Sequence, residues 1–227
     1  MMDMMEAVRR RHSVRAYLDR PIEGAVQHAL VEALAVASRE SGLDFRLHVE
    51  EPGAFDCLLS RMGKFSGVRN YITAVGPKNG PKSLSEACGY EGEKVVLLAQ
   101  ALGLNTCWVG LTCRRRPESL HLAADEKPYI VISVGYGATQ GVPHRSRPRE
   151  RVMRADPPVP DWFLAGVDAA LLAPTAINQQ KFLFTLMPDG RVSATAGLGF
   201  YATMDLGIAK CHFEIGSGKD RSIWLPA

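Results

Sequence analysis

The chain has 227 residues, of which 46% are hydrophobic and 22% are charged, a composition typical of globular proteins and not of disordered or fibrous ones. Lys plus Arg total 27 and Asp plus Glu total 24, so the net charge of +3 does not indicate a general nucleic-acid binder. The five cysteines form no CxxC pair, so we expect neither a disulfide framework nor a metal site. Without a signal-like or membrane-spanning apolar segment, the sequence predicts a cytoplasmic protein that does not bind membranes.

The N-terminal part predicts two helices. Apolar and basic residues at helical spacing indicate a short helix over 2–11, followed by an extended segment over 13–19. Apolar residues that recur every three or four positions predict an amphipathic helix over 22–37, and Gly42 should end it.

The middle of the chain predicts strands around one buried helix. Alternation over 43–49 and a short apolar run over 71–75 each indicate a strand. The segment 91–104 has few polar breaks and predicts a helix that is buried on most sides. The β-branched run over 129–134 favours a central strand.

The C-terminal part begins with a segment over 135–161 that is rich in Gly, Pro and Arg and predicts a long connection. A helix is expected over 161–172, a strand pair over 181–187 and 191–195, and a last helix over 201–215.

A comparison of the chain with itself suggests two related halves. A shift of 158 − 21 = 137 residues aligns Pro21 with Pro158, and both windows then read as turn, apolar helix, small-residue turn and strand. A shift of 211 − 107 = 104 residues aligns Cys107 with Cys211. Any two helix–strand units look alike in this way, so the alternatives at this point are a true repeat and a coincidence.

The segment RRRHSVRAYLDRP places Arg11, Ser13 and Arg15 at alternate positions directly after the first helix. Residues two apart point to the same side of an extended backbone. Guanidinium groups donate charge-assisted hydrogen bonds in a fork that suits phosphate. The spacing therefore indicates a phosphate clamp, against the alternative of an exposed basic helix end.

A second polar segment, LLAPTAINQQKFLF, lies between a predicted helix and a predicted strand. Pro174 ends the helix, and Thr175, Asn178 and Gln180 supply short polar groups in the turn. Such a turn can present N–H groups and an amide to a polar ligand, or it can serve only to end the helix.

Together these segments resemble the nitroreductase superfamily of FMN-dependent oxidoreductases. RHSVRAYLDRPI is similar to its Arg-x-Ser-x-Arg motif, and APTAINQQKFLF to its Ala-Pro-Ser-x-x-Asn-x-Gln-Pro-Trp motif. GEKVVLLAQALGLNTCWVG resembles the central interface helix and the turn at the flavin, and YIVISVGYG with PHRSRPRE resembles the late strand and basic tail. The resemblance implies an α+β fold, with a mainly antiparallel sheet flanked by helices.

The resemblance also implies which residues bind FMN. The opening motif would hold the phosphate and one edge of the ring system, and the basic tail would add phosphate contacts. The implied residues are Arg11, His12, Ser13 and Arg15 of the opening motif, Lys64 before the second strand, Val109 and Gly110 of the central turn, Arg145 and Arg147 of the basic tail, and Pro174, Thr175, Ala176 and Asn178 of the second motif. No side chain needs to act as acid or base, so no catalytic residue is expected. Packing is favoured over cavity lining for Trp108, and burial over redox chemistry for Cys107 and Cys211.

The order of the motifs departs from the family's, because the intact second motif lies at 173–184 instead of shortly after the first. Family members are homodimers whose FMN sites combine the two motifs from different subunits. The chain resembles a subfamily in which one chain mimics the dimer through two pseudo-twofold related halves. We expect a first half over 1–140, a connection over 141–160 and a shortened second half over 161–227. Each chain should bind at most one FMN, and the protein should be a monomer or a weakly associated dimer.

The implied function is an FMN-dependent enzyme that oxidises NADH or NADPH and reduces a small-molecule acceptor such as a nitroaromatic or a quinone. The alternative is a flavin-binding protein without turnover, a sensor or a remnant, because one copy of each motif has decayed. Nucleic-acid binding through RRRH, CRRR and RSRPRER is a third reading, which the 7% aromatic content and the small net charge oppose.

Overall fold

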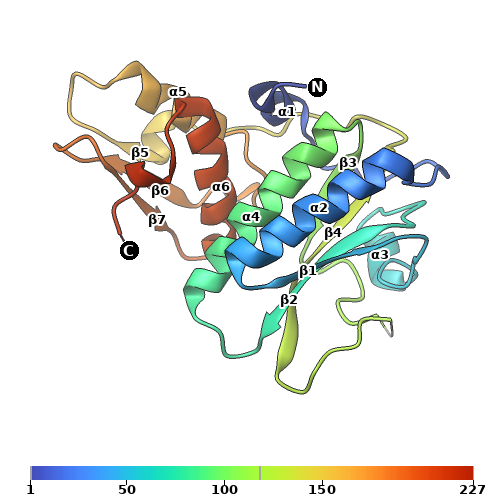
Figure 1. Cartoon of the computed structure of the whole chain (residues 1–227). Helices are drawn as coiled ribbons and strands as arrows, with labels where there is room; N and C mark the ends of the chain where they lie inside the picture. The colour runs from blue at the N-terminus through green and yellow to red at the C-terminus, as the bar shows by residue number, and fades with distance from the viewer. Residues whose placement is uncertain (1, 118, 227) are drawn as a thin grey trace.

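The computed structural model describes residues 2–117 and 119–226 (Figure 1). The helices are α1 (Met4–Arg10), α2 (Gly24–Ser41), α3 (Leu58–Met62), α4 (Lys82–Ala101), α5 (Asp161–Ala170) and α6 (Ala202–Ser217). The strands are β1 (Asp44–His48), β2 (Tyr71–Pro77), β3 (Asn105–Val109), β4 (Glu126–Gly135), β5 (Met153–Arg154), β6 (Phe182–Leu186) and β7 (Val192–Ala196). Short 3-10 helices are η1 (Arg149–Arg151), η2 (Ala176–Asn178) and η3 (Arg221–Ile223).

The larger sheet has the strand order β1-β2-β4-β3, and each neighbouring pair is antiparallel. β4 lies between β2 and β3, as its continuous apolar run predicts, because a strand covered on both faces buries every side chain. All residues of β4 from 128 to 135 are buried. The antiparallel sheet with its flanking helices confirms the α+β class expected from the sequence.

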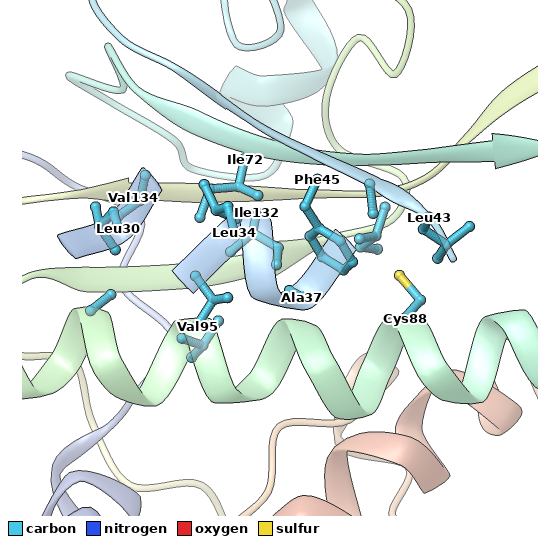
Figure 2. Close-up of a cluster of buried hydrophobic side chains, with 14 of the residues drawn as sticks. Leu30, Leu34, Ala37, Leu43, Phe45, Ile72, Cys88, Val95, Ile132 and Val134 are labelled. Atoms are coloured by element: carbon cyan, nitrogen blue, oxygen red, sulfur yellow. The ribbon is translucent and has the colours of Figure 1, made fainter. Parts of the chain in front are cut away.

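Helices α2 and α4 enclose the main hydrophobic core against this sheet (Figure 2). α2 contributes Leu30, the sheet contributes Phe45 and Ile132, and α4 contributes Val95, each at most 5% exposed. The apolar face of α2 follows from its spacing of three and four residues. As predicted, Gly42 ends this helix in the left-handed conformation, with φ of 72°.

A smaller sheet, β5-β6-β7, packs with α5 and α6 in the C-terminal part of the chain. Phe213 of α6 lies within its core, with the ring centroids of Phe184 and Trp224 at 4.9 and 5.1 Å. Tilted aromatic pairs at this distance add stability beyond the apolar area that they bury. The rings therefore fix α6 to the smaller sheet.

Helices α4 and α6 pack against each other and connect the two parts of the chain (Figure 1). A Cβ atom at Gly89 would lie 2.0 Å from the backbone oxygen of Met204. A Cβ atom at Gly207 would lie 2.0 Å from the backbone oxygen of Glu86. Because both obstacles are backbone atoms, only glycine permits this approach of the two helices.

The predicted bounds of the central helix are wrong, since α4 begins at Lys82 and ends at Ala101 instead of spanning 91–104. Gly89 and Gly92 have low helix propensity and suggest a turn in the sequence. In the fold they make room for neighbours. A Cβ atom at Gly92 would lie 2.7 Å from the ring of Trp108.

The structure also differs from the prediction at strands whose hydrogen-bonding partner is distant in the sequence. β3 lies in the segment that resembles the turn at the flavin, and it pairs with β4, which places Trp108 opposite Ile132. α3 has no counterpart in the prediction. The predicted connection over 135–161 contains η1 and also β5, which pairs with β6. Local periodicity carries no information about such partners.

Within residues 2–117 and 119–226, every helix is too short or too polar to cross a lipid bilayer. The same residues hold no cluster of three or more His, Cys, Asp or Glu side chains that could bind a metal ion. The five cysteines are free, and Cys107 and Cys211 are buried as expected.

Replacing Gly89 with Ala should destabilise the protein by about 3 kcal/mol, the upper part of the range for overpacking, because the backbone of α6 cannot rotate away. This loss exceeds the gain of about 1 kcal/mol in helix propensity. Urea denaturation followed by circular dichroism measures it. Ser83→Ala, at an exposed position of the same helix, is the control and should change stability by less than about 0.5 kcal/mol. Equal stability of the two variants would contradict the close crossing.

Candidate functional site

A cavity of about 720 Å³ is lined by residues from both parts of the chain. Its volume lies within the range of about 300–1,000 Å³ that small-molecule sites occupy. The predicted site residues on its wall are Arg11, His12, Ser13, Arg15, Lys64, Val109, Gly110, Pro174, Thr175, Ala176 and Asn178. The fold thus brings residues from the two ends of the chain to one hollow.

The opening motif alternates from Ser13 to Arg15, whereas His12 lines the cavity together with Arg11. Ser13 forms a bridge to Thr106 of β3, and the N–H of Val14 donates to the oxygen of Thr106 at 3.0 Å. Val14 is 1% exposed and points into the core, whereas Ser13 and Arg15 line the cavity. The Arg15 guanidinium lies 5.9 Å from the ring centroid of Phe65.

Arg11 occupies a different environment from Arg15, since it is only 3% exposed. Its Nη2 donates to the oxygen of Leu172 at 3.2 Å, and its Nε lies 3.5 Å from Oε1 of Glu93. Burial lowers the pKa of Arg11, and the negative charge of Glu93 opposes that effect. Arg11 is therefore a buried, fixed cation on the cavity wall.

Arg145 and Arg147 do not line the cavity, and both side chains are exposed. Their backbone is held instead. The oxygen of Arg145 accepts from Nδ2 of Asn178 at 2.9 Å, and the N–H of Arg147 donates to Oε1 of Gln180 at 2.8 Å. Oδ1 of Asn178 accepts from Nε2 of Gln180 at 2.7 Å, so both ends of the Asn178 amide have protein partners.

A smaller cavity of about 280 Å³ shares Arg11, His12, Pro143 and His144 with the larger one. The pKa of His12 is lowered by burial and then by the positive charges of Arg11 and His144. Mutual repulsion of this kind is relieved when an anion binds among the cations. This end of the site therefore favours a phosphate. The sequence-based prediction lacks His144, although it lies in the basic tail that was singled out.

The turn after α5 has an unusual backbone. Ile177, Asn178 and Gln180 have φ values of 48°, 55° and 42°, a left-handed conformation that costs about 1–3 kcal/mol for such residues. Oγ1 of Thr175 accepts from the N–H of Gln180 at 3.0 Å, and Gln180 is 2% exposed. Side-chain hydrogen bonds of this kind hold the turn in place. Strained backbone of this type clusters at ligand sites.

Asp205 of α6 anchors the same turn and lines the cavity. Its carboxylate accepts from the N–H of Ala176 at 3.0 Å and from Nε2 of Gln179 at 2.7 Å. Burial raises the pKa of Asp205 to about 6, although these hydrogen bonds oppose the rise. The sequence-based prediction lacks Asp205, and its signal is a single acidic residue within the apolar helix ATMDLGIA.

Aromatic residues complete the wall. Trp108, for which packing is the favoured prediction, both packs in the core and lines the cavity. Its Nε1 donates to Oε2 of Glu93 at 2.9 Å. The hydroxyl of Tyr201 donates to the oxygen of Gly110 at 3.3 Å, which joins the end of β3 to the start of α6.

Apolar side chains surround the entrance, and each is more than 60% exposed. They are Met62, Leu111, Val142, Ile177 and Phe200. Large exposed apolar groups that gather at one opening mark a binding site for an apolar surface. The cavity therefore combines a basic inner end with an apolar entrance.

Asp205 predicts a pH-dependent stability. Its pKa is raised from 3.8 to about 6, so the folded protein binds a proton more readily than the unfolded chain and gains stability as pH falls through this window. Relative to Asp205→Asn, the unfolding free energy of the natural protein should rise by up to about 3 kcal/mol between pH 7 and pH 4. Denaturation curves across this range measure the difference. Asp56→Asn, at an exposed position, is the control, and a pH-independent difference for Asp205→Asn would refute the assignment.

Comparisons with known proteins agree with this architecture. A Thermotoga maritima chain described as a nitroreductase is 24% identical, with a TM-score of 0.68 over 95% of this chain and 83% of that one. A Parabacteroides distasonis chain described as an NADH dehydrogenase or NAD(P)H nitroreductase is 24% identical, with a TM-score of 0.50 over 66% of this chain and 95% of that one. A Desulfovibrio desulfuricans nitroreductase in complex with FMN is 18% identical, with a TM-score of 0.49 over 65% and 93%.

No curated protein matches the chain at a significant level. The likeness to the Thermotoga maritima structure shows the fold. The sequence profile of the family described as "Putative TM nitroreductase" matches residues 3–217, which is most of the chain. The chain belongs to this nitroreductase family.

Proposed function

We propose that the protein is an FMN-dependent oxidoreductase that takes a hydride from NADH or NADPH and passes electrons to an apolar acceptor, such as a nitroaromatic or a quinone. The observation that carries the proposal is that the Arg-x-Ser-x-Arg segment and the Pro-Thr-x-x-Asn segment line one cavity. Neither segment alone distinguishes a ligand site from ordinary helix ends.

The residues present fit FMN. The basic end around Arg11, His12 and His144 suits the phosphate, because charge-assisted donors bind phosphate strongly. Arg11 lines both cavities, and its guanidinium is held in place by the oxygen of Leu172 and by Glu93. The rest of the larger cavity, beside Arg15 and Val109, has room for the ring system.

When bound, FMN supplies the hydride and electron-transfer chemistry, and the protein binds, orients and shields it. Trp108 and Tyr201 form part of the cavity wall, while Phe200 and Ile177 give the entrance an apolar surface. A planar apolar acceptor matches that entrance. The alternative of a flavin-binding protein without turnover predicts the same cavity, so it is separated by experiment.

We further propose that the chain is a pseudo-dimer, with halves over 1–140 and 161–227 joined by the connection 141–160. The α4–α6 contact supports it, because Gly89 approaches Met204 while Gly207 approaches Glu86. The same shift, 207 − 89 = 118 and 204 − 86 = 118, relates the members of both contacts. Reciprocal contacts of this kind characterise twofold interfaces. The shift of 118 residues between the paired positions at this crossing differs from the shift of 104 residues that aligns Cys107 with Cys211.

The function is tested with the purified protein and added FMN. We expect the absorbance peaks of oxidised flavin to bleach when NADH or NADPH is added without oxygen, and to return when a quinone or nitroaromatic is added. Boiled protein with the same amount of FMN is the control. Bound flavin that neither nucleotide bleaches would favour the alternative without turnover, and the absence of flavin binding would refute both.

The pseudo-dimer predicts one FMN per chain and a monomer or weakly associated dimer. The first half retains the opening motif and the second half retains the Pro-Thr-x-x-Asn motif, so only one complete site forms. Fluorescence titration measures the stoichiometry, and light scattering measures the mass. Two equivalent FMN sites per chain, or an obligate dimer whose flavin is bound between chains, would contradict this proposal.

A further inference from the structure

Three charged or titratable side chains meet beneath the cavity wall. Arg11 follows α1, Glu93 belongs to α4 and His212 belongs to α6. Glu93 and His212 are both 0% exposed. Oε1 of Glu93 lies 2.8 Å from Nε2 of His212 and 3.5 Å from Nε of Arg11, so this oxygen stands between the two basic groups.

The hydrogen-bond partners of His212 determine how many protons the cluster holds. Its Nδ1 lies 3.1 Å from the backbone oxygen of Ala169, and its Nε2 faces the Glu93 carboxyl. A carbonyl oxygen cannot donate, so Nδ1 must carry a hydrogen to satisfy this contact. The contact with Glu93 then needs a second proton, either on Nε2 or on the carboxyl group. A buried pair without that proton would set two acceptors against each other.

Both arrangements have the same total charge. A doubly protonated His212 with an ionised Glu93 sums to zero, and a neutral His212 with a protonated Glu93 also sums to zero. Oε2 of Glu93 accepts from Nε1 of Trp108 at 2.9 Å, a contact that suits either state. The pair therefore does not cancel the positive charge of Arg11.

No other described group neutralises Arg11. Among residues 2–117 and 119–226, Glu93 is the only carboxylate within ion-pair distance of Arg11. The thiol of Cys107 is close to Arg11, but burial raises the pKa of this thiol, so it stays neutral. Arg11 lines both cavities, and the other basic side chains at the smaller one are those of Arg9, His12 and His144.

We propose that Glu93 and His212 are positioning residues that share one proton and so leave the charge of Arg11 uncompensated toward the cavity. Glu93 fixes Arg11 from behind, and His212 prevents the carboxylate from neutralising it. The guanidinium then attracts a phosphate group. That this phosphate belongs to FMN rests on the proposed function, whereas the charge arrangement itself does not.

The proton count is tested directly on the flavin-free protein by nitrogen NMR of histidine side chains at pH 7, with His212→Gln to assign the signals. The expected result is a His212 ring with a hydrogen on Nδ1, either doubly protonated or in the neutral Nδ1–H form. A neutral ring with its hydrogen on Nε2 would leave Glu93 ionised and Arg11 neutralised, and would overturn the proposal. The measurement is made on the natural protein, and the His212→Gln variant serves only to assign the signals.

The consequence is tested with inorganic phosphate and with FMN, by calorimetry, on His212→Gln, Glu93→Gln and the double variant. In His212→Gln the carboxylate is free to ionise beside Arg11, so both affinities should fall about tenfold, the equivalent of one hydrogen bond to a charged group. Glu93→Gln keeps a neutral amide beside Arg11, so it should lose less affinity than His212→Gln. The double variant should recover to the affinity of Glu93→Gln, because its pair is again uncharged.

A merely structural role predicts the opposite order, with the double variant at least as weak as His212→Gln. That order, or an unchanged affinity in His212→Gln, would refute the inference. Thermal unfolding of each variant verifies the fold, and the NMR result on the natural protein decides the question where a variant does not fold. If phosphate binding and NMR agree with expectation while FMN does not bind, the proposed function fails and the charge arrangement stands.

Discussion

The close contact of α4 with α6 is the constraint on which the site depends. It joins the part of the chain that carries the larger sheet to the part that carries the smaller one, and both parts line the cavity. Gly89 and Gly207 permit backbone contact at the crossing, where any side chain would force the helices apart. A wider separation would also break the contact between the buried side chains of Glu93 and His212.

The same contact stabilises the strained turn after α5. Left-handed backbone at Ile177, Asn178 and Gln180 is unfavourable in an isolated peptide. Asp205 is carried on α6, and its position next to Ala176 follows from the packing of that helix on α4 and α5. The pKa of Asp205 is raised because the carboxylate that holds the turn is itself buried.

Charge is distributed unevenly along the cavity. Arg11, His12 and His144 gather at one end, whereas Asp205 lies on α6 with its oxygens used by Ala176 and Gln179. Burying a cation whose neighbours cannot neutralise it is unfavourable, and binding of a ligand of opposite charge offsets this unfavourable free energy. The exposed apolar rim at the entrance has the complementary property and suits the uncharged part of a ligand.

The elements with strong periodicity and the residues of the two polar segments can be predicted without the fold. The amphipathic pattern of α2, the alternation of β1 and the β-branched run of β4 each report burial directly, since one face or both faces of those elements meet the core. In the opening motif, alternate residues of an extended segment share a side. Its Ser13 and Arg15 accordingly reach the cavity.

The remaining features depend on contacts between segments that lie far apart in the chain. The start of α4 could not be located from the sequence, since Gly89 lowers local helix propensity and is explained by a helix more than 100 residues away. The exposed position of Arg145, the internal partners of Asn178 and the role of Asp205 depend on hydrogen bonds between distant segments. Arg11 was predicted as part of a phosphate clamp, and packing buries it against Glu93, which in turn contacts His212. Local patterns specify which side of an element is buried, whereas the partner that it meets there is set by the packing of the whole chain.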